Sequence, residues 1–358
     1  MPCAFITGVS GQDGSYMAEL LLHKGYTVYG MIRRSSNMSN LNRIRKIRNN
    51  ERLKIHYGDI TDLASVTKIM NLAYNDETKS GSPLHVYNLA AQSHVRVSFD
   101  VPIYTAQSDG IGVLNVLEAI IQLPDYSPSS VRFYQASTSE LYGSTPGPQN
   151  ENTLMKPQSP YGVAKLYAYW IVKNYRDIYN GFFVNGILFN HESERRPENF
   201  VTRKITNYVA NYANGTVAEP LRLGNLYSKR DWGYAKDYVN AMYLMLEQDQ
   251  PEDFVVSTGE CHTVKDFVEE AFECIGVKVE WSGSGLSEVG IDSKTSKPLI
   301  VIDSNYFRPT EVDYLLGDAS KANEKLGWYP STSFKELVSI MVSYDQDNIS
   351  NKSLGTSS

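Results

Sequence analysis

Short apolar runs alternate with longer helical patterns through the first half of the chain. The apolar runs predict strands at residues 3–7, 26–32, 54–59, 86–91 and 131–137. Helical stretches lie between them, for example at residues 112–123. This alternation predicts an α/β fold built on a Rossmann-like, doubly wound parallel sheet.

The pattern changes beyond about residue 187, where the alternation becomes irregular and loops are rich in Arg, Asn and Pro. We therefore expect residues 1–187 to form a Rossmann domain, completed by segments from about 220–255. Residues 188–345 are expected to form mainly a smaller mixed α/β lobe that binds the substrate. The small, polar residues of 346–358 predict a flexible tail.

The first predicted strand runs into Gly8-Val-Ser-Gly11-Gln-Asp-Gly14 and then into a helical pattern. Glycines in such a turn let the backbone approach a pyrophosphate, which then lies on the helix N-terminus. The spacing is G-x-x-G-x-x-G, and an ordinary glycine-rich turn is the alternative. Because a strand and a helix flank the turn on the correct sides, we expect a dinucleotide site.

The second predicted strand ends in Arg33 and Arg34. A site for NAD usually offers a carboxylate at this point, whereas arginine suits the additional 2′-phosphate of NADP. The sequence therefore predicts NADP as the cofactor. The alternative is that both arginines begin a solvated basic loop, since further basic residues follow closely.

Ligands of doubly wound sheets bind beyond the carboxyl ends of the strands. This rule places residues 8–14, Asp59, residues 90–93 and residues 137–140 around one crevice. Thr138 and Glu140 are two residues apart, so on a strand they would project from the same face. A carboxylate beside hydroxyl groups adds a second acid/base group and indicates chemistry beyond simple hydride transfer. A solvated strand-end carboxylate is the alternative.

A tyrosine and a lysine lie four residues apart in Ser159-Pro-Tyr161-Gly-Val-Ala-Lys165. Ser159 is expected to cap a helix that Pro160 begins, so Tyr161 and Lys165 share one helix face. The ammonium is expected to lower the pKa of the phenol and make it a usable proton acceptor. The pair alone is weak evidence, because both residues are common on helix surfaces.

The composition is that of a globular enzyme long enough for two lobes, with 358 residues of which 42% are apolar and 21% charged. A net charge of −6 argues against nucleic-acid binding. Three scattered cysteines indicate a reducing compartment and a cytoplasmic protein. No apolar run can span a bilayer, the first residues predict a strand rather than a signal sequence, and the histidines show no metal-ligand spacing.

Together, the glycine triplet and the Tyr-x-x-x-Lys pair resemble the extended short-chain dehydrogenase/reductase superfamily, to which the NAD-dependent epimerases and dehydratases belong. Six strings resemble the GDP-mannose 4,6-dehydratase family within it: Ala136-Ser-Thr-Ser-Glu-Leu-Tyr-Gly143, Leu188-Phe-Asn-His-Glu-Ser193, Asn199-Phe-Val-Thr-Arg-Lys-Ile205, Arg230-Asp-Trp-Gly233, Lys236-Asp-Tyr238 and Arg308-Pro-Thr-Glu-Val-Asp313. The similarity runs from residue 2 to about residue 341.

The resemblance implies conversion of GDP-mannose to GDP-4-keto-6-deoxymannose and water, through oxidation at C4, elimination across C5 and C6, and hydride return to C6. It implies four catalytic residues: Thr138, Glu140, Tyr161 and Lys165. The expected NADP site comprises Gly8, Gly11, Gln12, Asp13, Gly14, Arg33, Asp59, Ile60, Leu89, Ala90, Ala91, Ser93, Tyr104, Ser137, Tyr161, Lys165, His191 and Arg196. The expected GDP-mannose site comprises Ser93, Asn190, Asn199, Lys204, Gly224, Arg230, Arg308 and Glu311, with Arg203 as a further candidate.

One segment departs from the family, whose members usually read His-Glu-Ser-Pro-Arg-Arg-Gly. Here Glu194 replaces the proline and Pro197 the glycine, so we expect a reshaped loop that keeps the charges of Arg195 and Arg196. The resemblance also implies self-association as a dimer or tetramer, in which residues 35–43 reach a neighbouring subunit.

Three alternatives remain open. The chain could act on another nucleotide sugar as a 4,6-dehydratase or 4-epimerase, although an epimerase does not need Glu140 beside Thr138. It could also reduce its 4-keto product with NADPH to a GDP-6-deoxyhexose such as GDP-rhamnose. A non-enzymatic NADP sensor is the third possibility, but a sensor needs none of the acid/base residues.

Overall fold

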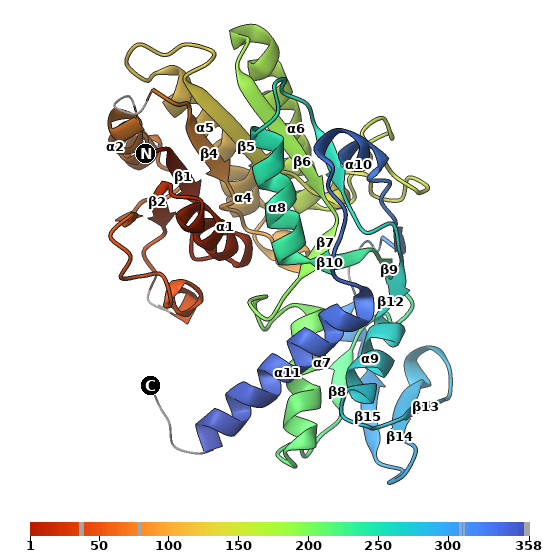
Figure 1. Cartoon of the computed structure of the whole chain (residues 1–358). Helices are drawn as coiled ribbons and strands as arrows, with labels where there is room; N and C mark the ends of the chain where they lie inside the picture. Colours follow the sequence, from red (N-terminus) through yellow and green to blue (C-terminus); the bar gives the residue numbers. More distant parts are fainter. Residues whose placement is uncertain (36–38, 78–80, 308–309, 311, 354–358) are drawn as a thin grey trace.

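A computed structural model describes residues 1–35, 39–77, 81–307, 310 and 312–353. Its centre is a parallel sheet with the strand order β11-β6-β5-β4-β1-β2-β3 (Figure 1). The strands are β1 (Cys3–Thr7), β2 (Thr27–Ile32), β3 (Leu53–Tyr57), β4 (Leu84–Asn88), β5 (Val131–Ala136), β6 (Phe182–Leu188) and β11 (Phe254–Val256). The predicted doubly wound parallel sheet is confirmed, although β3, β4 and β5 end earlier than expected.

Helices cover both faces of this sheet. One face carries α1 (Gln12–His23), α8 (Ala235–Leu246) and α10 (Ser320–Leu326), which pack with the sheet into one apolar core. The other face carries α2 (Leu63–Glu77), α5 (Gly112–Ile121) and α6 (Pro160–Tyr179), which share a second core. Three short elements lead from β4 into α5, namely α3 (Val95–Asp100), α4 (Pro102–Ala106) and the π-helical turn η2 (Gln107–Ile111).

The smaller lobe contains a mixed sheet of β13 (Val279–Ser282), β14 (Val289–Asp292), β15 (Pro298–Ile302) and β8 (Leu221–Leu223). Its helices are α7 (Val201–Ala213), α9 (Val264–Glu273) and α11 (Phe334–Ser353), and a third apolar core joins them to the sheet. In Figure 1 this lobe lies below the carboxyl ends of the central strands.

Short pairs of strands connect the lobes. β7 (Asn190–Glu192) pairs with β10 (Trp232–Tyr234), and β9 (Lys229–Arg230) pairs with β12 (His262–Thr263) and β16 (Tyr314–Leu315). The remaining elements are the 3₁₀ turns η1 (Ser39–Ile44), η3 (Ser139–Leu141), η4 (Gly285–Ser287) and η5 (Ser304–Tyr306). Within the range 220–255, α8 and β11 join the central sheet, whereas β8 belongs to the smaller lobe. The domain boundary at residue 187 stays a prediction.

The predicted tail begins too early. Helix α11 continues to Ser353 instead of ending near residue 345, and residues 354–358 lie outside the described part of the chain. Where the tail was expected to begin, the buried carboxylate of Asp345 pairs with Arg203 at 2.8 Å and accepts a hydrogen bond from Thr206 at 2.7 Å. These contacts attach the polar helical turn around Asp345 to α7.

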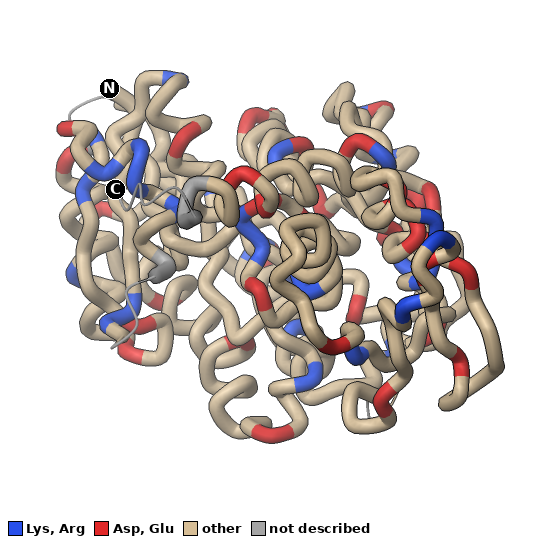
Figure 2. Tube along the Cα trace, turned by 90° about the horizontal axis from the view of Figure 1, so that it is seen from below, with Lys and Arg blue, Asp and Glu red and all other residues tan. Residues whose placement is uncertain are grey.

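The surface is of mixed charge. Figure 2 shows basic and acidic residues interspersed along the chain trace in both lobes. Within the described ranges, no helix is both long and apolar enough to cross a membrane. Cys3, Cys261 and Cys274 are free thiols.

Candidate active site

The glycine triplet forms a tight turn between β1 and α1. Gly8 has a φ of +71° and donates its N–H to the Met31 carbonyl at 3.0 Å. A Cβ on Gly14 would lie 2.3 Å from the carbonyl oxygen of Gly8, so that a side chain at this position is excluded. Gly11 caps α1 without a side-chain hydrogen bond, which leaves the first N–H groups of the helix for a ligand. The geometry fits a pyrophosphate cradle.

A cavity of about 770 Å³ extends from this turn along the carboxyl edge of the sheet to the smaller lobe. It is lined by every residue of the expected NADP site: Gly8, Gly11, Gln12, Asp13, Gly14, Arg33, Asp59, Ile60, Leu89, Ala90, Ala91, Ser93, Tyr104, Ser137, Tyr161, Lys165, His191 and Arg196. Thr138 and Glu140 line it as well.

The smaller lobe supplies the other wall of the cavity. Asn190, Asn199, Lys204, Gly224 and Arg230, with Ser93 from the first domain, line the cavity, and their role in binding substrate stays a prediction. The two remaining substrate candidates, Arg308 and Glu311, lie outside the described residues. Arg203 does not line the cavity, because its guanidinium turns to the buried carboxylate of Asp345.

Helix α6 begins as the sequence predicts. The Ser159 hydroxyl accepts a hydrogen bond from the Gly162 N–H at 3.0 Å, and Pro160 occupies the first turn. Tyr161 and Lys165 are both buried on the cavity side of the helix. The Nζ of Lys165 lies 5.8 Å from the centre of the Tyr161 ring and donates to the Ala136 carbonyl at 3.1 Å.

The expected low pKa of Tyr161 is wrong for this arrangement. Burial raises the pKa of Tyr161 above its ordinary value, and the negative charges of Asp109 and Glu140 raise it further. A hydrogen bond with Thr138 and the charge of Arg196 oppose the rise. The i, i+4 spacing indicated a neighbouring ammonium but could not show that the phenol is removed from water.

Thr138 and Glu140 are not alternating strand residues, because β5 ends at Ala136. Thr138 instead caps the short turn η3, and its hydroxyl accepts the N–H of Glu140 at 3.2 Å. Both side chains are nearly buried and reach the cavity that Tyr161 lines. The two acid/base candidates therefore meet, but through a helical turn.

An ion pair ties the glycine turn to the segment after β6. His191 Nε2 lies 2.9 Å from an Asp13 carboxylate oxygen, and Nδ1 lies 2.8 Å from the Phe189 carbonyl. Burial disfavours both charges, but the pairing prevails: the pKa of Asp13 is lowered and that of His191 is raised. In the described residues, His, Cys, Asp and Glu form no group of three or more that could hold a metal.

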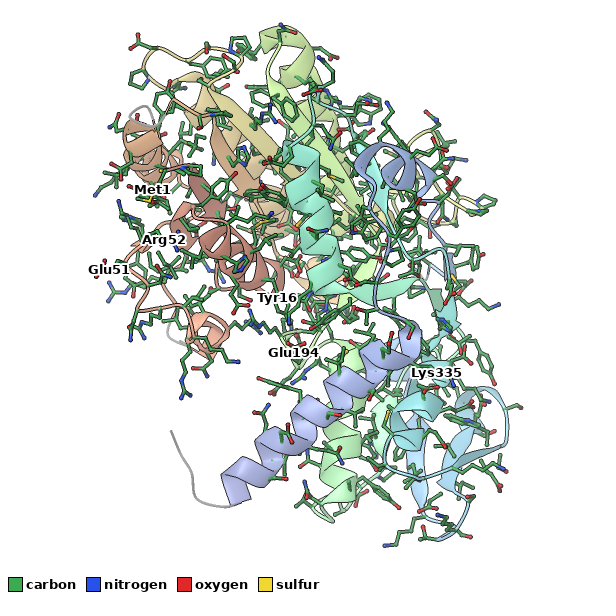
Figure 3. All side chains as sticks on the ribbon, in the orientation of Figure 1. Met1, Tyr16, Glu51, Arg52, Glu194 and Lys335 are labelled. Carbon is green, nitrogen blue, oxygen red and sulfur yellow. The ribbon has the colours of Figure 1, made fainter. Side chains whose placement is uncertain are left out.

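The departing segment packs against α1. Glu194 accepts a hydrogen bond from the Tyr234 hydroxyl at 3.3 Å, and Figure 3 shows it below Tyr16 at the junction of the lobes. Burial and the Glu194 carboxylate raise the pKa of Tyr16. Arg195 pairs with Glu19 at 2.7 Å, and Arg196 pairs with Glu192 at 3.1 Å. Whether this loop differs in shape from other members stays a prediction.

Arg33 is exposed at the end of β2, where its guanidinium contacts the Tyr104 hydroxyl. Both residues line the cavity, so a positive charge stands at the adenosine end of the expected cofactor site. Arg43 is a lining residue that the sequence assigned only to an intersubunit arm. Its Nε donates to the Arg195 carbonyl at 2.7 Å and its Nη1 to the Ser10 carbonyl at 3.3 Å. Residues 36–38 of that arm lie outside the described chain.

Other lining residues were also missed from the sequence. Ser108, Arg222 and Tyr306 reach the cavity from loops and short elements that carry no recognisable pattern. Lys204 Nζ lies 4.6 Å from the centre of the Tyr306 ring, which places a cation and an aromatic face side by side at the far end of the cavity. Only the basic and aromatic character of these residues hinted at a ligand.

A glycine cradle at the switch point of a parallel sheet, with a buried Tyr–Lys pair beside it, defines an enzyme of the short-chain dehydrogenase/reductase class. The solved structure of dTDP-glucose 4,6-dehydratase from Bacillus anthracis, in complex with NAD, has the same fold, with a TM-score of 0.77 and 20% identity over 98% of each chain. The chain belongs to the GDP-mannose 4,6 dehydratase family, whose sequence model matches residues 5–341.

The names of similar curated proteins support membership of this family. The GDP-mannose 4,6 dehydratase of Cricetulus griseus is 54% identical over 349 residues, which are 96% of this chain and 91% of the relative. That of Homo sapiens is 53% identical over the same shares of the two chains. The family expected from the motifs is therefore confirmed.

Proposed function

We propose that the protein converts GDP-mannose to GDP-4-keto-6-deoxymannose and water. One observation carries the proposal: Glu140 and Thr138 share a cavity with the Tyr161 and Lys165 pair. A dehydration needs a second acid/base group beyond the one that serves oxidation, and Glu140 is that group. The choice of GDP-mannose as the substrate is supported by the relatives named as GDP-mannose 4,6 dehydratases.

The residues present fit a nicotinamide dinucleotide, with NADP favoured over NAD. A Cβ on Gly14 would clash with the Gly8 carbonyl oxygen at 2.3 Å, and a Cβ on Gly8 or Gly11 would lie within 3.1 Å of backbone atoms, so the turn is as tight as a pyrophosphate cradle requires. Arg33 offers a charge suited to a 2′-phosphate, and the buried Lys165 has ammonium protons beyond the one given to Ala136. When bound, this cofactor would supply the hydride acceptor for C4 of the sugar and the hydride donor for C6.

The proton transfers fall to side chains of this chain. Tyr161 accepts the proton of the O4 hydroxyl, with Lys165 favouring the phenolate and orienting the cofactor ribose. The resulting 4-ketone acidifies the C5 proton, which Glu140 removes. The C6 hydroxyl then leaves as water, protonated with help from Glu140 or Thr138. The short turn η3 holds both of these side chains on one wall of the cavity.

The opposite wall of the cavity is proposed to bind the nucleotide part of GDP-mannose. Lys204 and Arg230 line this wall and are proposed to bind the diphosphate, since arginine's planar fork suits phosphate oxygens. Asn190, Asn199 and Gly224 line the same wall and are proposed to contact the sugar and guanosine. Arg308 and Glu311 complete this set from outside the described residues.

Incubation of the protein with GDP-mannose and NADP tests the proposal, with the product followed by mass spectrometry and NMR. Loss of one water with a new 4-keto group is expected. Unchanged mass with altered stereochemistry would show an epimerase and contradict the proposal. A parallel reaction with added NADPH asks whether the 4-keto product is reduced further, since loss of only one oxygen would reveal a GDP-6-deoxyhexose.

A further inference from the structure

A buried carboxylate outside the sequence motifs lies behind the Tyr161 and Lys165 pair. Asp109 is fully buried on the π-helical turn η2, and its neighbour Ser108 lines the active-site cavity. The turn packs closely against α6, since a Cβ on Gly110 would lie 3.5 Å from the carbonyl oxygen of Ala164. π-Helical turns are rare in proteins, and those that do occur are often found at functional sites.

The two oxygens of Asp109 have different surroundings. Oδ1 accepts hydrogen bonds from the Gln92 N–H at 2.7 Å and from the Ser108 hydroxyl. Oδ2 is buried and has no hydrogen-bond partner within the part of the chain that the structure describes. A buried carboxylate with an oxygen that accepts no hydrogen bond destabilises a fold. A nearby positive charge is therefore needed to stabilise Asp109.

Lys165 supplies that charge from α6. Burial raises the pKa of Asp109, and the Lys165 ammonium opposes the rise. In turn, burial lowers the pKa of Lys165, and Asp109 opposes that fall. The other charged groups that act on Tyr161 are Glu140 and Arg196, from the η3 turn and the segment after β7.

We propose that Asp109 is a positioning residue, the buried counter-charge that keeps the Lys165 ammonium protonated beside Tyr161. This role rests on the proposed function of Tyr161 as the proton acceptor. Asp109 acts through Lys165 and touches no reacting atom. Its bond to Gln92 also fixes the loop after β4, so the same carboxylate connects the catalytic pair to the loop that carries Ser93.

The pH dependence of kcat/KM for GDP-mannose dehydration tests this role. Asp109→Asn keeps the shape and removes the charge, so Lys165 and Tyr161 both lose their protons at lower pH. Both limbs of the pH profile are expected to move to lower pH by about 1 unit. A merely structural role would lower the rate without moving the profile.

Two further variants make the test independent of how well Asp109→Asn folds. Ser108→Ala removes the hydroxyl that helps Asp109 ionise, and a smaller shift in the same direction is expected. Asp253→Asn is the matched control: this carboxylate is also buried but pairs with Arg176 at 2.9 Å. It is expected to lower the melting temperature and leave the profile in place.

The outcomes separate the two proposals. An active wild type with superimposable profiles for wild type and Asp109→Asn would overturn the role of Asp109 alone. If Asp109→Asn does not fold, an unshifted Ser108→Ala profile overturns it. A wild type that forms no dehydrated product would overturn the proposed function, and the inference with it.

Discussion

The Nζ of Lys165 lies 5.8 Å from the centre of the Tyr161 ring, while its hydrogen bond goes to the Ala136 carbonyl. The two residues share one face of α6, yet burial dominates the phenol and raises its pKa. This relationship sets the pH behaviour that the account predicts. Tyr161 must lose its proton before it can accept one from the sugar.

The rate of dehydration is therefore expected to rise with pH. A tyrosine with a raised pKa is mostly protonated near neutrality, so the reactive phenolate fraction increases about tenfold per pH unit below that pKa. Steady-state kcat/KM measured from about pH 6 to 9 checks this. Tyr161→Phe should lose roughly 10²- to 10⁴-fold in kcat and abolish the dependence. A flat wild-type profile would show that a different group accepts the proton.

Glu140→Gln is expected to lower dehydration by about 10²- to 10⁴-fold, because the amide cannot remove the C5 proton. Cofactor binding and the melting temperature should stay close to those of the wild type. The measurement is deuterium uptake at C5 in heavy water, read by NMR, together with the product mass. Glu273→Gln, at an exposed position in α9, is the control and should leave both unchanged. Dehydration at the wild-type rate in Glu140→Gln would remove Glu140 from the mechanism.

Much of this site follows from local sequence, because its parts are local. The glycine turn and the Ser159 cap each depend on a few consecutive residues, and each forms where the sequence predicts. The parallel strands also form near their predicted positions, although three of them end early. The parallel sheet then brings their carboxyl ends to one edge without further information. The resemblance to family motifs predicted the residues that the smaller lobe contributes to the opposite wall of the cavity.

The remaining features depend on packing between distant segments. The turn at Thr138 and Glu140 forms where β5 ends below α6, and the pKa of Tyr161 reflects burial by several elements. Asp109 carried only a weak signal, a carboxylate just before the apolar helical stretch at residues 112–123. Asp345 in α11 pairs with Arg203, which lies in a helix over a hundred positions earlier in the chain, and no local pattern reports this pairing.

Asp13→Asn is expected to destabilise the protein by about 1–3 kcal/mol, through loss of its buried bond to His191. Asp13 has a lowered pKa, so its contribution is present above its unfolded pKa and is lost as pH falls through the folded one. His191 has a raised pKa, so its contribution is full below its unfolded pKa and is lost as pH rises through the folded value. The stability difference between wild type and variant should therefore be largest in weak acid.

Urea unfolding at about pH 6, below the ordinary pKa of a histidine, and at about pH 9, above it, measures this difference. Asp100→Asn is a suitable control, because its pair with Arg96 is solvent-exposed and contributes little. An equal loss of stability at both pH values would mean that His191 does not change its charge between them, and would contradict this prediction.

Arg33→Ala is expected to weaken NADP binding about tenfold or more and to leave NAD binding nearly unchanged, since only NADP carries the 2′-phosphate. Titration of the protein with each cofactor, followed by nicotinamide fluorescence or calorimetry, provides the two affinities. Arg34→Ala serves as the neighbouring control, because Arg34 does not line the cavity. Equal losses for both cofactors would place Arg33 at a shared phosphate instead.

The central claim is that one cavity oxidises C4, eliminates water and returns the same hydride to C6. GDP-mannose deuterated at C4 tests it directly, with NADP in trace amounts and the product examined by NMR and mass spectrometry. The account predicts loss of one water and recovery of the deuterium at C6. Deuterium that remains at C4, or a product of unchanged mass, would contradict it.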